Sequence, residues 1–210
     1  MKPAMTGGVS GAGAPDTEAS TRKRVLEAAL TLFSERGLQA PSLREVARTA
    51  GVSLGALQHY FPTREDLHQA VMAHAVSTFP GIELLRQLGE VEMEALLRAG
   101  LHTNVSWARA HPRVRKLGTH LALEQPEHEW PGEAETNAEL VRRIRRAQEN
   151  GELRAFDPAC LLVLVEILMN GWSSFQPHYA RHLSHVEAEK VDAVFLDFVV
   201  DVVMHGLKRR

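Results

Sequence analysis

The sequence contains a single cysteine, Cys160, among its 210 residues. One cysteine excludes an internal disulfide framework and a multi-cysteine metal site. Cys160 lies inside an apolar run, so we expect a small, buried hydrophobic residue rather than a nucleophile. We expect no cofactor and no resident metal.

Long apolar stretches are also missing. No segment reaches 18 consecutive apolar residues, so we expect no membrane span. Residues 1–20 lack the apolar segment of a signal peptide. Both absences predict a protein of the reducing cytoplasm.

Alternating strand patterns and paired hairpin turns are absent, which predicts an all-α fold. Residues 1–19 are rich in Gly, Ala, Ser, Thr and Pro, and we expect them to form a disordered tail. From residue 20 the apolar residues recur at helical spacings, and about nine helices are expected. The predicted division is a DNA-binding domain over 20–66 and a ligand-binding and dimerisation domain over 67–210.

The sequence has no HExxH, GxSxG, phosphate-binding loop or dinucleotide-binding motif. An all-helical enzyme therefore stays open only as an alternative without a defined site. The formal net charge of -2 does not indicate nucleic-acid binding by itself. Residues 20–70, however, carry seven Lys or Arg against five acids, a weak preference for phosphate.

Two short capped helices are predicted around a glycine. Ser42-Leu43-Arg44-Glu45 is typical of a capping box, and Gly51 ends the first helix. Ser53 caps a second helix that Pro62 ends, and Thr63 caps the next one. Short helices joined across Gly51-Val52-Ser53 have the layout of a helix-turn-helix, packed against an earlier helix through Val25 to Phe33.

The outward residues of the second short helix suit base recognition in the DNA major groove. Gln58 can pair with adenine through two hydrogen bonds, Leu54 can touch a thymine methyl group, and Gly55 permits close backbone approach. Other side chains around this helix are placed to donate to phosphates, partly through helix N-termini: Ser42, Arg44, Ser53, Tyr60, Thr63 and Arg64.

The stretch from Thr21 to about Phe79, with RVLEAALTLFSERG and SLREVARTAGVSLGALQHYFPTREDL, resembles the DNA-binding domain of the tetracycline-repressor-like (TetR) family. The resemblance covers about a quarter of the chain. It implies an all-helical homodimer that pairs through its last two helices, binds a palindromic operator in double-stranded DNA and holds a small-molecule inducer. Residues at the family's DNA-contacting positions are Ser42, Ser53, Leu54, Gly55, Gln58, His59, Tyr60 and Arg64.

Two positions depart from the commonest family pattern. Leu54 stands where a polar or basic residue is frequent, and Gln58 stands where tyrosine is frequent, so the operator sequence is not implied. The sign of regulation is open as well, because an activator or a dimeric scaffold has the same helical layout as a repressor.

The C-terminal region offers candidate pocket residues but no motif. An apolar helix is expected from Asp157-Pro158 to Pro177, buried on both faces, and a final one over about 186–207. Glu166, the one charge between Leu161 and Met169, should have a partner inside the fold or contact the inducer. Trp107, Met169, Trp172 and Phe175 could line an inducer pocket, although core or interface packing is the favoured role.

Two further clusters favour ordinary interpretations. Acids lie at helical spacings around Arg142, Arg143, Arg145 and Arg146, which indicates a solvated, ion-paired helix face. His178, His182 and His185 could share one helical face. With eleven histidines in the chain, coincidence is favoured over a metal site.

Overall fold

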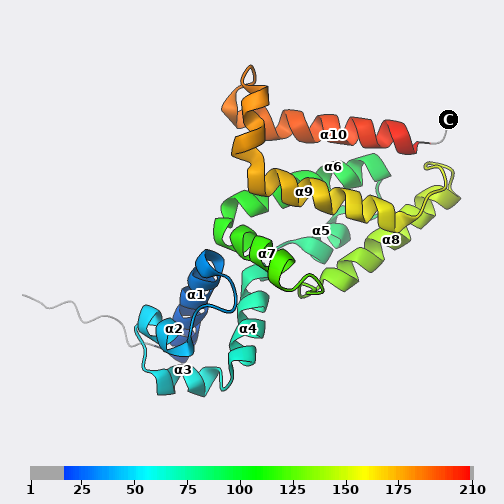
Figure 1. The fold of residues 1–210 in the computed structure, drawn as a ribbon. Coiled ribbons are helices and arrows are strands. Elements are labelled where there is room, and N and C mark those ends of the chain that lie inside the picture. The colour runs from blue at the N-terminus through cyan, green and yellow to red at the C-terminus, as the bar shows by residue number, and fades with distance from the viewer. Residues whose placement is uncertain (1–16, 209–210) are drawn as a thin grey trace, which may run out of the picture.

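The computed structural model describes residues 17–208 (Figure 1). Within this range the fold is all-α, as predicted, with no strand beyond one isolated bridge between Leu153 and Lys208. The helices are α1 (Glu18–Arg36), α2 (Leu43–Ala50), α3 (Leu54–Tyr60), α4 (Arg64–Val76), α5 (Gly81–Leu88), α6 (Met93–Ala110), α7 (Pro112–Glu124), α8 (Glu133–Glu149), α9 (Pro158–Ala180) and α10 (Val191–Leu207).

The described helices number ten rather than nine because α5 forms directly after Pro80, where the sequence predicts only a break. The expected tail over residues 1–19 lies mostly outside the described residues. Its last part is helical, since Thr17 caps α1 through a bond from the Ser20 amide (3.2 Å).

The helices gather around two apolar cores. The first joins α1 to α4 with the inner face of α7, which contributes Val114, Leu117 and Leu121. The second contains residues of α5, α6, α8, α9 and α10. The predicted domain boundary at residues 66 and 67 falls inside α4, and α7 packs with the N-terminal helices although it comes later in the chain (Figure 1).

Helix α9 is not buried on both faces, so that prediction was wrong. Met169 and Trp172 face the second core, whereas Cys160 and Glu166 are exposed. Pro177 also fails to end the helix, which continues to Ala180. The last helix begins at Val191 because two 3₁₀ turns, Arg181–Leu183 and Ala188–Lys190, occupy the preceding segment.

The segment Pro158–Leu183 is long and apolar enough to cross a membrane when judged by length and composition alone. A core or interface helix of a water-soluble protein meets the same test. Apolar side chains exposed on α9 and α10 are Val163, Leu164, Ile167, Phe175 and Tyr179, and Val194, Phe198 and Val202. These residues are called the α9–α10 apolar face below.

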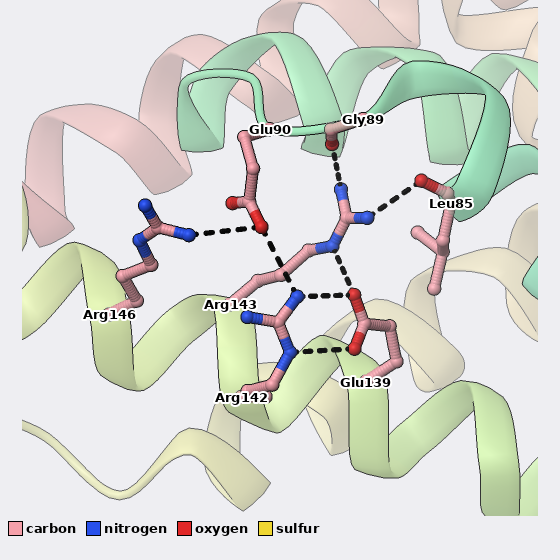
Figure 2. A network of polar contacts seen from close by, with 7 residues as sticks. All are labelled: Leu85, Gly89, Glu90, Glu139, Arg142, Arg143 and Arg146. Atoms are coloured by element: carbon pink, nitrogen blue, oxygen red, sulfur yellow. Dashed lines mark hydrogen bonds and ion pairs between the residues drawn. The ribbon is translucent and has the colours of Figure 1, made fainter.

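An arginine network joins α8 to the end of α5 (Figure 2). Arg143 is only 8% exposed and donates to the backbone oxygens of Gly89 (2.5 Å) and Leu85 (2.6 Å) and to Glu139 (2.8 Å). Arg142 bonds Glu139 through two nitrogens, and Glu90 lies 3.0 Å from Arg146. Arg142, Arg143 and Arg146 are therefore ion-paired, and Arg143 also satisfies the carbonyls that end α5.

Replacing Arg143 with Met should lower the free energy of unfolding by about 2 kcal/mol, because two carbonyl oxygens at the end of α5 lose their donor. Urea unfolding followed by circular dichroism measures the change. Arg145→Met, an exposed neighbour on α8, is the matched control and should change stability by less than about 0.5 kcal/mol. Equal losses in both variants would contradict the role given to Arg143.

The same network predicts a pH effect. Hydrogen bonds from Arg142 and Arg143 lower the pKa of Glu139 from 4.5 to about 2. Unfolding restores the higher pKa, so the stabilisation is complete above pH 4.5 and is lost as the pH falls toward 2. The melting temperature of Glu139→Gln should lie below wild type at pH 6, and the gap should narrow by pH 3. A gap that does not change with pH would contradict this assignment.

Candidate nucleic-acid interface

Helices α2 and α3 form a helix-turn-helix around Gly51. This glycine has φ +67° and ψ 36°, the left-handed conformation that residues with a Cβ adopt at a cost. Its amide and that of Val52 bond the last carbonyls of α2, at Arg48 (3.1 Å) and Ala47 (3.0 Å). Leu57, fully buried, fixes α3 against the first core. The turn therefore sets the angle at which α3 leaves α2.

The predicted reading face of α3 lies outward. Gly55, Gln58 and His59 are exposed, and Leu54 and Tyr60 are half-buried. Apart from the adjoining residues and backbone of α3 itself, no atom of residues 17–208 lies within 4 Å of where a Cβ on Gly55 would sit, so packing among these residues does not require a glycine there. A close approach by a partner outside the chain would explain it.

Three residues that were predicted to contact phosphates cap helices. The Ser42, Ser53 and Thr63 hydroxyls accept from the amides of Glu45 (3.2 Å), Ala56 (3.1 Å) and Asp66 (3.1 Å). A hydroxyl that accepts can still donate, and the two serines are exposed. Thr63 instead donates to the Asp66 carboxylate (2.7 Å), which also accepts from the Thr63 amide. These bonds lower the pKa of Asp66 and occupy the proton that a phosphate would receive.

The capping box expected at Ser42 is only half formed. Glu45 pairs with Arg36 of α1 at 2.5 Å rather than with the Ser42 backbone. An ion pair between α1 and α2 therefore replaces the second bond of the box.

Among the predicted phosphate contacts, Arg64 and Arg44 differ in their surroundings. Arg44 is exposed on α2. Arg64 is half-buried, and its Nη2 donates to the backbone oxygen of Leu38 at 2.6 Å. The structure thus gives Arg64 a partner inside the protein.

Sequence reasoning did not single out two other exposed cations near α3. The Arg22 guanidinium lies 5.3 Å from the centre of the Phe61 ring, at the end of α3, in a cation–π contact. Arg48 sits on the last turn of α2 with its side chain 80% exposed. The basic composition of residues 20–70 was the available signal, but spacing alone could not select among its cations.

Two family models match the chain. One, described as bacterial regulatory proteins of the tetR family, covers residues 25–71. The other, described as the tetracyclin repressor-like C-terminal domain, covers residues 103–204. The chain belongs to the TetR family. It is a transcriptional regulator with an N-terminal helix-turn-helix, as the sequence predicted.

Curated relatives agree with this assignment. The chain is 40% identical over 62 residues to the HTH-type transcriptional repressor KstR2 of Mycolicibacterium smegmatis, a match that spans 28% of this chain and only 30% of the relative. It is 25% identical over 205 residues to the HTH-type transcriptional regulator RutR of Escherichia coli, which covers 90% and 91% of the two chains. The higher identity therefore belongs to a short stretch of the chain, and the match over nearly the whole length is at 25%.

Solved structures share the fold of this TetR-family chain. A transcriptional regulator of Streptomyces coelicolor has a TM-score of 0.69 at 24% identity, covering 91% of this chain and all of its own. The TetR-family protein CprB of S. coelicolor has a TM-score of 0.66 at 22% identity, covering 90% of both chains.

The five predicted pocket residues do not converge on one cavity. Trp107 lines an open hollow of about 460 Å³ between the α4–α5 turn and α6, with Thr78, Pro80, His102, Thr103 and Ser106. Met169 and Trp172 are core residues. Trp172 stacks on Phe195 (3.9 Å) and donates to Asp192 (3.1 Å). Glu166 and Phe175 are exposed.

His178, in the last turn of α9, and His182, just beyond it, share one arginine neighbour. The Arg181 side chain lies 3.5 Å from the His178 ring nitrogen and 3.4 Å from that of His182. Across residues 17–208, no group of three His, Cys, Asp or Glu side chains is placed to hold a metal ion.

Proposed function

We propose that this TetR-family regulator is a homodimeric repressor that binds a palindromic operator through α3 and leaves it when a small molecule binds the C-terminal helices. The single observation that carries the proposal is the reading face of α3. Its core side, Leu57, is buried, while Gly55, Gln58 and His59 are exposed together. A short helix with this division suits insertion into the major groove.

Exposed cations support the same surface. Arg44 and Arg48 on α2 and Arg22 on α1 flank α3, and the exposed Ser42 and Ser53 add hydroxyl donors. We assign these residues to phosphates and Gln58, His59 and Leu54 to base edges. Phosphate contacts fix the orientation of α3 but carry no sequence information, so Gln58 is the main candidate for selectivity.

The α9–α10 apolar face supports the homodimer. Both helices pack on α6 and leave the apolar face uncovered. An apolar area of this kind favours burial by a partner over exposure to water. A twofold pair of copies would cover it and place the two α3 helices one DNA turn apart, ~34 Å.

The hollow beside Trp107 is the ligand site that we assign. Its volume of about 460 Å³ falls in the range of small-molecule sites. It combines the Trp107 ring with the hydroxyls of Thr78, Thr103 and Ser106 and the imidazole of His102. A ligand there would contact both α6 and the turn after α4, the helix that follows α3.

A gel shift with the full-length protein tests the proposal. The probes are duplex DNA from the region upstream of the protein's own coding sequence and a scrambled duplex of equal composition. We expect a discrete complex with the first duplex only. Its affinity should fall as salt rises, because binding releases cations from the DNA phosphates and added salt opposes that release. Equal affinity for both duplexes would overturn the proposal. A reporter under the same upstream region, with and without the regulator, separates repression from activation.

A further inference from the structure

The backbone of Leu38, in the turn between α1 and α2, is held from two sides. Its amide donates to the Glu124 carboxylate at the end of α7 (3.2 Å), and its carbonyl accepts from Arg64 of α4 (2.6 Å). The Leu38 side chain is 1% exposed in the first core. This one residue therefore meets both the linking helix α4 and the later helix α7.

Gly37 makes the Glu124 contact possible. Its φ is +79°, and a Cβ at this position would overlap the Glu124 carboxylate. A glycine thus serves both the positive φ of the turn and the close approach of the Glu124 carboxylate. The α1–α2 turn is built to receive the carboxylate.

The opposite end of α7 lies at the hollow. His111, the residue before Pro112, stacks on Trp107 (4.5 Å), and its Nε2 lies 3.1 Å from the Thr78 hydroxyl. Trp107 donates to the same hydroxyl (3.1 Å). Helix α7 has 13 residues and is therefore about 20 Å long. It connects the hollow at one end with Leu38 at the other.

Contacts along α7 keep it in register with α1. Arg113 donates to Glu27 (2.7 Å) and Thr31 (2.8 Å), and Glu27 also pairs with His74 of α4 (2.8 Å). Burial would raise the pKa of Glu27, but its bonds to His74 and Arg113 prevail and lower it, so the carboxylate is charged at neutral pH. Arg113 thus fixes the start of α7 on α1, and Glu124 fixes its end on the α1–α2 turn.

We propose that Glu124 is a positioning residue that couples α7 to the reading helix by holding the Leu38 backbone. The proposal rests on the function proposed above. Leu38 lies four residues before the Ser42 cap of α2, and α2 carries α3 across Gly51. A displacement that starts beside Trp107 and moves α7 must move the α1–α2 turn with it or break this bond.

The test measures the orientation of the α2–α3 unit in the full-length protein by electron paramagnetic resonance. Spin labels are placed through Thr49→Cys on α2 and Arg145→Cys on α8, two exposed positions, in a Cys160→Ser background. Labelled chains are diluted with unlabelled ones so that only distances within one chain are measured. Circular dichroism at the same temperature selects folded variants.

Glu124→Ala and Glu124→Asp should broaden the distance distribution, because the first removes the acceptor and the second shortens its reach. Glu124→Gln retains an oxygen that can accept the Leu38 amide and should give the wild-type distribution. Glu127→Ala, an exposed neighbour beyond α7, should do the same. A wild-type distribution in folded Glu124→Ala and Glu124→Asp, or broadening in Glu124→Gln equal to that in Glu124→Ala, would overturn the proposal.

A second measurement separates this proposal from the proposed function. The ratio of affinities for the upstream and scrambled duplexes should fall about 5-fold or more in Glu124→Ala, the usual range of coupling between sites. Affinity for the scrambled duplex should not change, since it depends on phosphate charge. If wild type shows no selective binding, the repressor assignment fails, while the distance distributions still decide the role of Glu124.

Discussion

Phe198→Asp should convert the proposed dimer into a monomer and weaken operator binding by on the order of 100-fold or more. Phe198 is 64% exposed at the centre of the apolar stripe on α10. In a twofold interface each substitution occurs twice, and burying an unpaired carboxylate costs several kcal/mol. Light scattering coupled to size-exclusion chromatography gives the mass, and a gel shift gives the affinity. Ile167→Asp on α9, also 64% exposed, should behave in the same way.

The matched control for the dimer lies on α7. Leu123 is 79% exposed but lies outside the α9–α10 apolar face, so Leu123→Asp should leave both mass and affinity at wild-type values. A Phe198→Asp variant that keeps the mass of a dimer would require another interface.

Gln58→Ala should weaken operator binding by ~1–3 kcal/mol, about 5- to 150-fold, and relax base preference at one position. The paired hydrogen bonds that an amide forms with adenine are lost, while the phosphate contacts stay. Fluorescence anisotropy on operator and scrambled duplexes measures both affinities. The scrambled duplex should bind as it binds wild type.

Gln69→Ala provides the control for Gln58. Gln69 is exposed on α4, where its amide lies 3.4 Å from Glu65. This variant should bind both duplexes as wild type does. Equal losses on operator and scrambled DNA in Gln58→Ala would mean that Gln58 contacts phosphate rather than a base.

The helix starts and the turn of the helix-turn-helix were predicted correctly from the sequence. Capped starts at Ser42, Ser53 and Thr63 and the turn at Gly51 depend on hydrogen bonds within a few residues, and all four are confirmed. The outward face of α3 followed from the same periodicity. The TetR-like motif added the family, which the C-terminal model then extended to residue 204.

Features that depend on distant contacts were not predictable. Arg64 turns toward Leu38, 26 residues away, and Glu124 reaches it across 86 residues. The exposure of Glu166 on α9 was not predicted either. An apolar helix has the same sequence pattern whether its second face packs in the core or against a second copy of the chain. Helix α5 was missed because Pro80 and Gly81 usually signal a break, yet here they begin a helix.

The first core has a consequence for dissecting this protein. Its residues run from Val25 to Ala75 and resume at Val114, Leu117 and Leu121. A fragment that ends at Val76 would lack the α7 residues of that core. The apolar surface exposed by their loss would favour aggregation. Transferring α1 to α4 to another regulator would therefore require α7 as well, so the two regions of the chain cannot be exchanged at a boundary placed after α4.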